Sequence, residues 1–113
     1  MISYPKREYL SKECAHKLKN SVVLNKIYLF GSTARRDDTP SSDIDICLVG
    51  PLNKLNRESR KIINNITAAI YIDNYLIINW IYFNLGEWKR EKFPIIKTIK
   101  KEGKVLWEKE KTG

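Results

Sequence analysis

The feature that most constrains this chain is a short segment in which acidic and apolar residues alternate before a purely apolar run. The segment DIDICLVG covers residues 43–50. In a β-strand, residues two apart point to the same side, so Asp43 and Asp45 share one face and the isoleucines that alternate with them share the other. Two carboxylates that close repel each other unless a cation binds between them. Oxygen ligands of this kind select Mg²⁺ or Mn²⁺. The segment therefore predicts a strand that begins at a cation site.

The apolar pattern along the rest of the chain predicts an α/β fold with one small sheet and helices packed on it. The expected helices cover residues 6–20, about 55–72 and about 85–101, the last interrupted or kinked at Pro94; the expected strands cover residues 27–30, 44–49, 75–83 and 103–108. A helical turn over residues 33–36, with Ser32 as its N-cap, follows the first strand. The strand at 75–83 is apolar on both faces apart from Asn79, which predicts a central place in the sheet. The strand at 103–108 is expected at an edge.

Length and composition predict a single domain over residues 1–113. The N-terminal segment is charged and lacks the apolar core of a targeting peptide, and no apolar run reaches the length of about 18 residues that spans a bilayer. We therefore expect a cytoplasmic protein without a membrane partner. Cys14 and Cys47 are expected to be reduced residues of the core, since cytosolic thiols rarely pair. His16 is expected on a helix surface, without a metal cluster around it.

The net charge of +8, from 21 Lys and Arg against 13 Asp and Glu, favours association with a polyanion. Lysines alternate with glutamates towards the C-terminus, which is typical of a solvated surface. No zinc-finger, recognition-helix or RNA-motif pattern accompanies them. A nucleic-acid-binding module is therefore a weaker alternative, which would require a steep salt dependence of affinity.

A Gly-Ser turn precedes the acidic segment by about a dozen residues. Gly31 lets the backbone approach a ligand closely, and the N–H groups of the residues after it favour an anion. Arg35 adds a charged partner for phosphate. Alone, a Gly-Ser pair is most often a turn and an Asp-x-Asp pair is often a cap or a structural cation site. Their order in one segment predicts a site for a metal-bound triphosphate.

The segment GSTARRDDTPSSDID, residues 31–45, resembles the signature of the DNA polymerase beta-type nucleotidyltransferase superfamily. In that superfamily Gly-Ser, an Arg three residues later and Ser-Asp-x-Asp are the hallmark. The short chain and its EGKVLW ending are similar to the minimal nucleotidyltransferases of prokaryotes. The resemblance implies the nucleotidyltransferase fold, with a small mixed β-sheet covered by helices.

The resemblance also implies metal-dependent nucleotidyl transfer, in which an acceptor hydroxyl attacks the α-phosphate of a nucleoside triphosphate, with ATP the first expectation. Roles carried over from the family are as follows: Gly31 and Ser32 hold the β- and γ-phosphates, Arg35 supports them, Ser42 steadies the loop, and Asp43 and Asp45 ligate two Mg²⁺ (or Mn²⁺) ions. Two metals in such a site stabilise both the attacking and the leaving oxygen.

The family pattern asks for a third carboxylate on the next strand, where this sequence has Asn79. An amide can coordinate a metal through its oxygen but cannot accept a proton. Asp73 would lie about 20 Å away along an extended strand and cannot substitute. Three explanations are open: the alignment is shifted, Glu58 or Glu87 reaches in from a helix, or catalysis is weakened.

In this family the usual partner of a minimal nucleotidyltransferase is a HEPN-type toxin, and the nucleotidyltransferase is the antitoxin that transfers AMP to a toxin tyrosine. The resemblance implies that function here. Its alternative is an inactive antitoxin that binds Mg-NTP and neutralises the partner by binding alone. The aromatic candidates for a partner surface are Trp80, Tyr82, Trp88 and Trp107, each with ordinary packing as the competing interpretation. A homo-oligomer is also open.

Overall fold

A computed structural model describes residues 4–36 and 43–110 of the chain. Within those ranges the elements are α1 (Tyr4–Ser21), β1 (Lys26–Phe30), α2 (Gly31–Arg35), β2 (Ile44–Gly50), α3 (Arg57–Asn74), β3 (Ile78–Asn84), α4 (Leu85–Lys89), α5 (Pro94–Glu102) and β4 (Lys104–Glu108). None of the helices described is long and apolar enough to cross a membrane.

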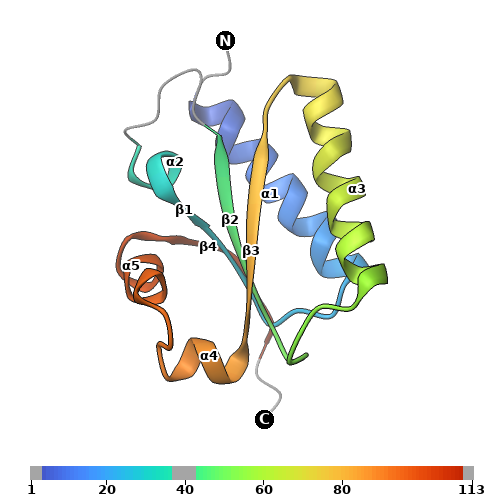
Figure 1. The fold of residues 1–113 in the computed structure, drawn as a ribbon. Helices are drawn as coiled ribbons and strands as arrows, with labels where there is room; N and C mark the ends of the chain where they lie inside the picture. Colours follow the sequence, from blue (N-terminus) through green and yellow to red (C-terminus); the bar gives the residue numbers. More distant parts are fainter. Residues whose placement is uncertain (1–3, 37–42, 111–113) are drawn as a thin grey trace.

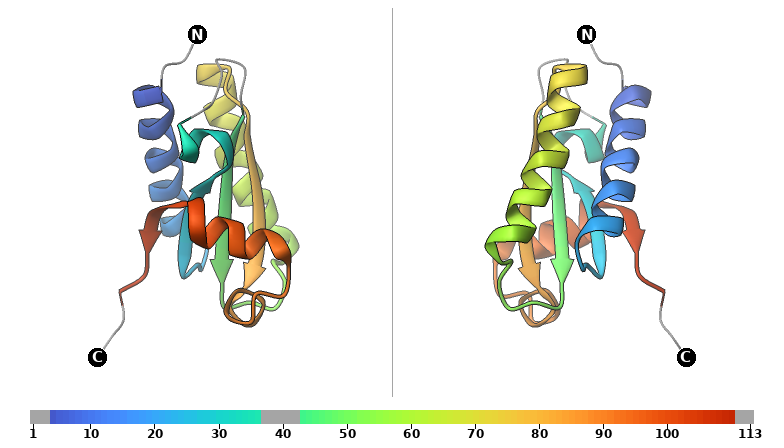
Figure 2. Two further views of the ribbon diagram at one scale, coloured as in Figure 1. Left: turned by 90° about the vertical axis from the view of Figure 1, so that its left-hand side faces the viewer. Right: turned by 90° about the vertical axis from the view of Figure 1, so that its right-hand side faces the viewer.

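The four strands form one mixed sheet in the order β3-β2-β1-β4. Strand β1 pairs antiparallel with both β2 and β4, whereas β2 and β3 are parallel. A parallel pair needs a crossover connection, and α3 supplies it. Helices α1 and α3 cover one face of the sheet, and α2 and α5 lie on the other, as Figures 1 and 2 show. The expected α/β fold with a small mixed sheet is confirmed.

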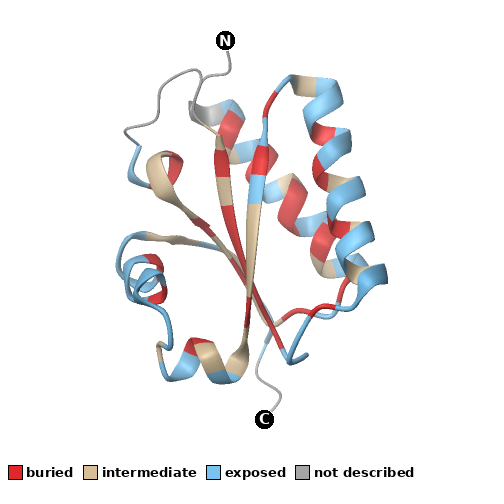
Figure 3. Cartoon of the chain, viewed as in Figure 1, coloured by how far each residue is buried: buried red, intermediate tan, exposed pale blue. Residues whose placement is uncertain are grey.

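Two groups of buried side chains hold these layers together (Figure 3). On the α1 and α3 face, Leu18 and Cys14 pack with Ile44 and Ile46 of β2. On the opposite face, α5 buries Ile96 and Ile99 against the other side of the same strand. Cys14 and Cys47 are both buried and free, as expected for reduced core residues. Strand β2 is therefore the centre of the core, and its polar start is held in place by packing on both faces.

Strand β3 is shorter than expected and lies at the edge of the sheet, so its predicted central position is wrong. The helix before it continues to Asn74, and Tyr75 closes that helix with a left-handed φ of 54°. The strand can therefore begin only after this turn. The apolar residues of β3 reflect the helix layers that cover its two faces, and the sequence pattern reports this burial. The pattern does not report whether another strand pairs with the outer edge of β3.

Two boundaries near glycine and proline test the local predictions. The expected helix over 85–101 is interrupted, because α4 ends at Lys89 and α5 begins with Pro94 at its first turn. The expected N-cap at Ser32 is wrong, since α2 already begins at Gly31 and has no side-chain cap. Gly31, with a φ of 75°, turns the chain directly from β1 into the helix. Ser32 is therefore already inside the helix and does not occupy the N-cap position.

Candidate functional site

The two aspartates and Asn79 meet where β2 and β3 begin. The parallel register places Asp45 opposite Asn79. Asn79 Nδ2 donates a hydrogen bond of 3.0 Å to Asp43 Oδ2 and lies 3.5 Å from Asp45 Oδ1. The neighbouring isoleucines of β2 are buried on the α1 and α3 face, so these polar groups belong to the α2 and α5 face. The strand alignment that the sequence suggested for Asn79 therefore holds in space.

Gly31 forms the opposite wall of this site. Phe30, the last residue of β1, pairs with Asp45, which brings the following glycine next to the carboxylate. A β-carbon built on Gly31 would overlap Asp45 Oδ2. The sequence indicated that Gly31 allows a close approach, and the structure identifies the group that approaches it as a carboxylate of the same chain. Only glycine combines this contact with a φ of 75°.

The surroundings of Asp45 oppose its negative charge. Burial is the main cause that raises the pKa of Asp45, and the nearby Asp43 carboxylate raises it further. The hydrogen bond from Asn79 and the charge of Arg35 lower the same pKa and offset part of this effect. A cation between the two carboxylates would favour the ionised form. The ionised form of Asp45 is therefore stabilised in part by the Asn79 hydrogen bond and the charge of Arg35, and a bound cation would add to that stabilisation.

Two further predicted residues, Ser32 and Arg35, belong to α2, which begins at Gly31. Ser32 is half-buried on α2, and Arg35 is exposed at the end of the same short helix. Arg35 Nη1 lies 3.6 Å from Glu102 Oε2 at the end of α5, an ion pair that no sequence pattern indicated. Ser42 lies outside the described residues. The structure thus brings Gly31, Arg35 and the acid pair to one end of the sheet.

The donor set fits a magnesium ion held together with a substrate phosphate. Mg²⁺ usually binds through one or two carboxylates and keeps its other positions for water and phosphate. Asp43 and Asp45 supply the carboxylates, and Asn79 can present its amide oxygen after a half-turn of its side chain. Among residues 4–36 and 43–110, no group of three or more Asp, Glu, His or Cys residues could hold a metal. Within the part of the chain that the structure describes, a metal here would therefore rely on the two acids and the amide.

Among residues 4–36 and 43–110, the structure brings no other acid to this site. Glu87 Oε1 accepts from the Asn84 N–H in the cap of α4, and Asn84 lies five residues beyond Asn79, about 17 Å along the strand. Glu58 lies in the first turn of α3, whereas the last turn of that helix leads to the start of β3. The hypothesis that Glu58 or Glu87 reaches in is therefore wrong. Asp73 belongs to α3 and not to an extended strand.

The four aromatic candidates for a partner surface differ in how far each is buried. Trp88 is buried and its ring lies 5.0 Å from that of Tyr28, so it cannot form a surface. Trp107 is partly buried against the core on the α1 face. Trp80 and Tyr82 are half-buried on β3. Trp80 and Tyr82 therefore lie on one edge strand of the sheet, β3, and Trp107 lies on the other, β4.

Comparison with known proteins places these features in a family. A family model described as "Polymerase beta, Nucleotidyltransferase" matches residues 12–112. No curated protein gives a significant match to the chain.

Three solved structures illustrate the shared fold. A candidate nucleotidyltransferase from Sulfolobus solfataricus has a TM-score of 0.65 and 22% identity, over 94% of this chain and 84% of the other. A toxin-antitoxin structure with AMP-PNP has a TM-score of 0.61 and 22% identity, over 87% and 73%. A complex of tri-AMPylated HEPN toxin from Shewanella oneidensis with its MNT antitoxin has a TM-score of 0.55 and 22% identity, over 90% and 73%. At such identities the likeness shows the fold alone.

Proposed function

The chain belongs to the polymerase beta nucleotidyltransferase family, and from that premise we propose that it is an antitoxin that binds a metal–NTP complex. The proposed reaction is transfer of the nucleoside monophosphate, AMP first, to a hydroxyl of a HEPN-type toxin. Two of the similar solved structures are toxin-antitoxin complexes, one with AMP-PNP and one with an AMPylated toxin. They support this choice of nucleotide and partner. The domain is proposed to cover residues 1–113 and to act in the cytoplasm.

One observation carries the proposal. Asp43 and Asp45 converge beside Gly31 at the open end of β2, with Arg35 close enough to lower the pKa of Asp45. A triphosphate needs positive charge and backbone N–H groups, while its metal needs carboxylates. In this proposal Gly31, Ser32 and Arg35 hold the phosphates, Ser42 steadies the loop, and the two aspartates hold Mg²⁺ or Mn²⁺. Of these residues, Gly31 and Asp45 are in contact and Asp43 shares Asn79 with Asp45, which supports a common site.

The chemistry would proceed by in-line displacement. The acceptor oxygen forms a bond to the α-phosphorus, the bond from that phosphorus to the bridging oxygen breaks, and pyrophosphate leaves. When bound, the metal ions supply Lewis acidity to the attacking and leaving oxygens. The hydroxyl proton needs an acceptor, and of the three polar side chains at the site only Asp43 and Asp45 can take it, because the amide of Asn79 cannot.

Asn79 favours a second candidate function, an antitoxin that binds Mg-NTP and neutralises its partner without transfer. The amide donates to Asp43, where the family pattern asks for a third carboxylate. This substitution removes one negative charge and one proton acceptor from the site. The binding residues are the same in both candidates, so only transfer distinguishes them.

The test is incubation of the chain with Mg²⁺, ATP and the protein encoded beside it, with ³²P at the α- or the γ-position. Transfer of AMP labels the partner from α-labelled ATP and not from γ-labelled ATP. The Asp43→Asn and Asp45→Asn variants should lose at least a hundredfold of this labelling, whereas Asp73→Asn, an exposed acid on α3, should keep it. ATP binding without label would select the binding-only function. Absence of Mg-ATP binding would refute both.

A further inference from the structure

Strand β3 has an outer edge with unusual composition. It is the terminal strand of the order β3-β2-β1-β4, so no strand of the described residues pairs with its outer side. Its sequence, INWIYFN, contains neither a charged residue nor a proline. Exposed edges are usually protected by charges, proline, bulges or a covering segment, because their free N–H and C=O groups template pairing with other chains. Strand β3 therefore lacks the charges and the proline that usually protect an exposed edge.

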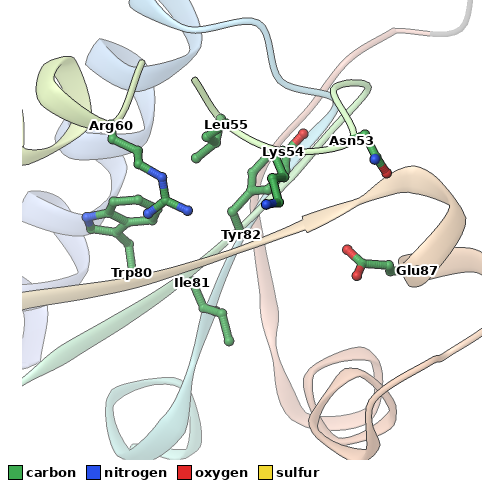
Figure 4. Close-up of a pocket in the computed structure, with 8 residues that line it drawn as sticks. All are labelled: Asn53, Lys54, Leu55, Arg60, Trp80, Ile81, Tyr82 and Glu87. Atoms are coloured by element: carbon green, nitrogen blue, oxygen red, sulfur yellow. The ribbon is translucent and has the colours of Figure 1, made fainter. Parts of the chain in front are cut away.

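On the α3 side of β3 lies a polar hollow of about 420 Å³ (Figure 4). Trp80 and Tyr82 form its floor, and Lys54 and Arg60 stand at its rim. The Arg60 guanidinium lies 5.8 Å from the Trp80 ring centre. Glu87 is its acidic lining residue, and that carboxylate already accepts from the cap of α4. The hollow therefore fits an acidic side chain that projects from a neighbouring strand.

On the α5 side of β3 the lining is mainly apolar. Figure 4 shows Ile81 pointing away from Trp80 and Tyr82, to the opposite side of the strand. There Ile81 and Phe83 border a groove of about 380 Å³ that Phe93 and Ile95 of the α5 region complete, and Tyr82 and Glu87 line the part that it shares with the polar hollow. Phe93 and Ile95 are 39% and 38% exposed, although they are large apolar residues. This groove fits an apolar side chain.

We propose that the outer edge of β3 pairs with an extended segment of a partner protein in which acidic and apolar side chains alternate. Side chains of an added strand point alternately to the two faces of the sheet. The alternation of the segment would match the basic hollow on one face and the apolar groove on the other. Main-chain hydrogen bonds to β3 supply affinity, and the two hollows supply specificity, as in other cases of β-strand addition.

Charge favours such a partner over a second copy of this chain. Two antiparallel β3 edges related by a two-fold axis would bring their α3 helices side by side on one face. The first turn of α3 and the loop before it carry Lys54, Arg57, Arg60 and Lys61 against Glu58. Like charges would then face each other across the dimer. An acidic segment would instead be attracted to the same edge.

The edge is also continuous with the candidate catalytic site. Asn79 lies on β3 next to Trp80 and contacts Asp43. A segment paired along β3 would therefore run past the acid pair. Such a segment could present a hydroxyl to the nucleotide, and this consequence rests on the proposed function. The pairing with β3 does not rest on it, because the test of the pairing uses neither nucleotide nor metal.

The test is an NMR titration of the ¹⁵N-labelled protein with acetylated octapeptides in which valine alternates with glutamate or with lysine. We expect shifts of the β3 amides and of the Trp80 indole N–H, and at least tenfold tighter binding of the glutamate peptide. Two further glutamate peptides carry N-methyl groups on odd or on even residues. One of the two should bind at least tenfold more weakly, because the N–H groups that it directs towards β3 are lost.

Arg60→Glu should remove or reverse the preference for the glutamate peptide. Lys61→Glu is the matched control, since it makes the same charge change on α3 at a residue that does not line the hollow, and it should keep most of the preference. Three results would overturn the proposal: both N-methylated peptides bind like the parent, Arg60→Glu behaves like Lys61→Glu, or sedimentation shows a dimer in which the β3 amides are protected from exchange.

Discussion

The carboxylate of Asp45 lies directly against the backbone of Gly31, where a β-carbon would overlap Oδ2. This contact joins the end of β1 to the start of β2 and fixes the position of one proposed metal ligand. The last residue before the glycine, Phe30, is itself paired with Asp45. Gly31 therefore contributes to the site because it has no side chain, which leaves room for the Asp45 carboxylate.

Gly31→Ala should abolish Mg-ATP binding and lower stability by about 1–2 kcal/mol, because alanine at a φ of 75° is strained and its methyl group displaces Asp45. Gly86→Ala is the matched control, since a β-carbon there meets its neighbours at 3.4 Å, an ordinary contact. Within helix α4 it should leave binding intact and stabilise by up to about 1 kcal/mol. Thermal denaturation and ATP titration measure both effects, and equal behaviour of the two variants would refute the role of Gly31.

Asn79→Asp should make the protein strongly dependent on divalent metal. The third carboxylate replaces a hydrogen-bond donor beside Asp43 and Asp45, so without metal we expect a loss of about 1–2 kcal/mol from repulsion and lost hydrogen bonds. Added Mg²⁺ should raise the melting temperature of this variant more than that of the parent. Asn79→Ala removes the same hydrogen bonds without a new charge and should lack the enlarged response. If the first variant responds to Mg²⁺ no more than the alanine variant, the acids do not share a cation.

Glu102→Gln should strengthen Mg-ATP binding several-fold at low salt. Glu102 pairs with Arg35 at 3.6 Å and competes with phosphate for the guanidinium. Both side chains are well exposed, so the loss of stability should stay below about 1 kcal/mol. Glu91→Gln breaks a comparable ion pair with Lys100 and serves as the control. Weaker binding by Glu102→Gln would show that the ion pair orients Arg35 rather than competing with phosphate.

The free energy of unfolding should fall as the pH rises above about 9. Burial raises the pKa of both Cys14 and Cys47 from 9.0 to about 12. Above pH 9 the unfolded chain releases these thiol protons while the folded chain keeps them, so stability present below pH 9 is lost progressively up to about pH 12. The slope is at most about 1.4 kcal/mol per thiol for each pH unit. Denaturant titrations from pH 8 to 10 measure it.

The double variant with alanine at both cysteines should show a shallower decline over the same pH range. In the parent protein neither thiol should react with a disulfide reagent until denaturant is added, since both side chains are fully buried. Rapid reaction under native conditions, or the same slope in the double variant, would contradict this prediction.

The acid pair and the strand after it could be predicted because both depend on local alternation along the chain. The same holds for the α5 boundary, where Pro94 cannot continue the preceding helix. The resemblance placed Asn79 where the family has a third carboxylate, and the structure adds the parallel register that sets it opposite Asp45. Ser42 stays a prediction, since it lies outside the described residues.

Features that depend on distant parts of the chain could not be predicted. The place of β3 at the edge depends on which strands pair, and the apolar alternation of a strand reports only its two faces. The Arg35–Glu102 pair joins residues far apart in sequence. Arg60 belongs to no sequence motif. Its place in the first turn of a helix is a signal in the sequence, because the helix dipole disfavours a basic residue there.

The order of strands in the sheet also bears on how much of the chain the site needs. Strands β1, β2 and β3, with Gly31, both aspartates and Asn79, all precede β4, which pairs with the remaining side of β1. The polar centre therefore lies on strands that pair with one another without β4. If β4 detached, β1 would expose an unpaired edge of its own, while the strands that carry Asp43, Asp45 and Asn79 would keep their pairing.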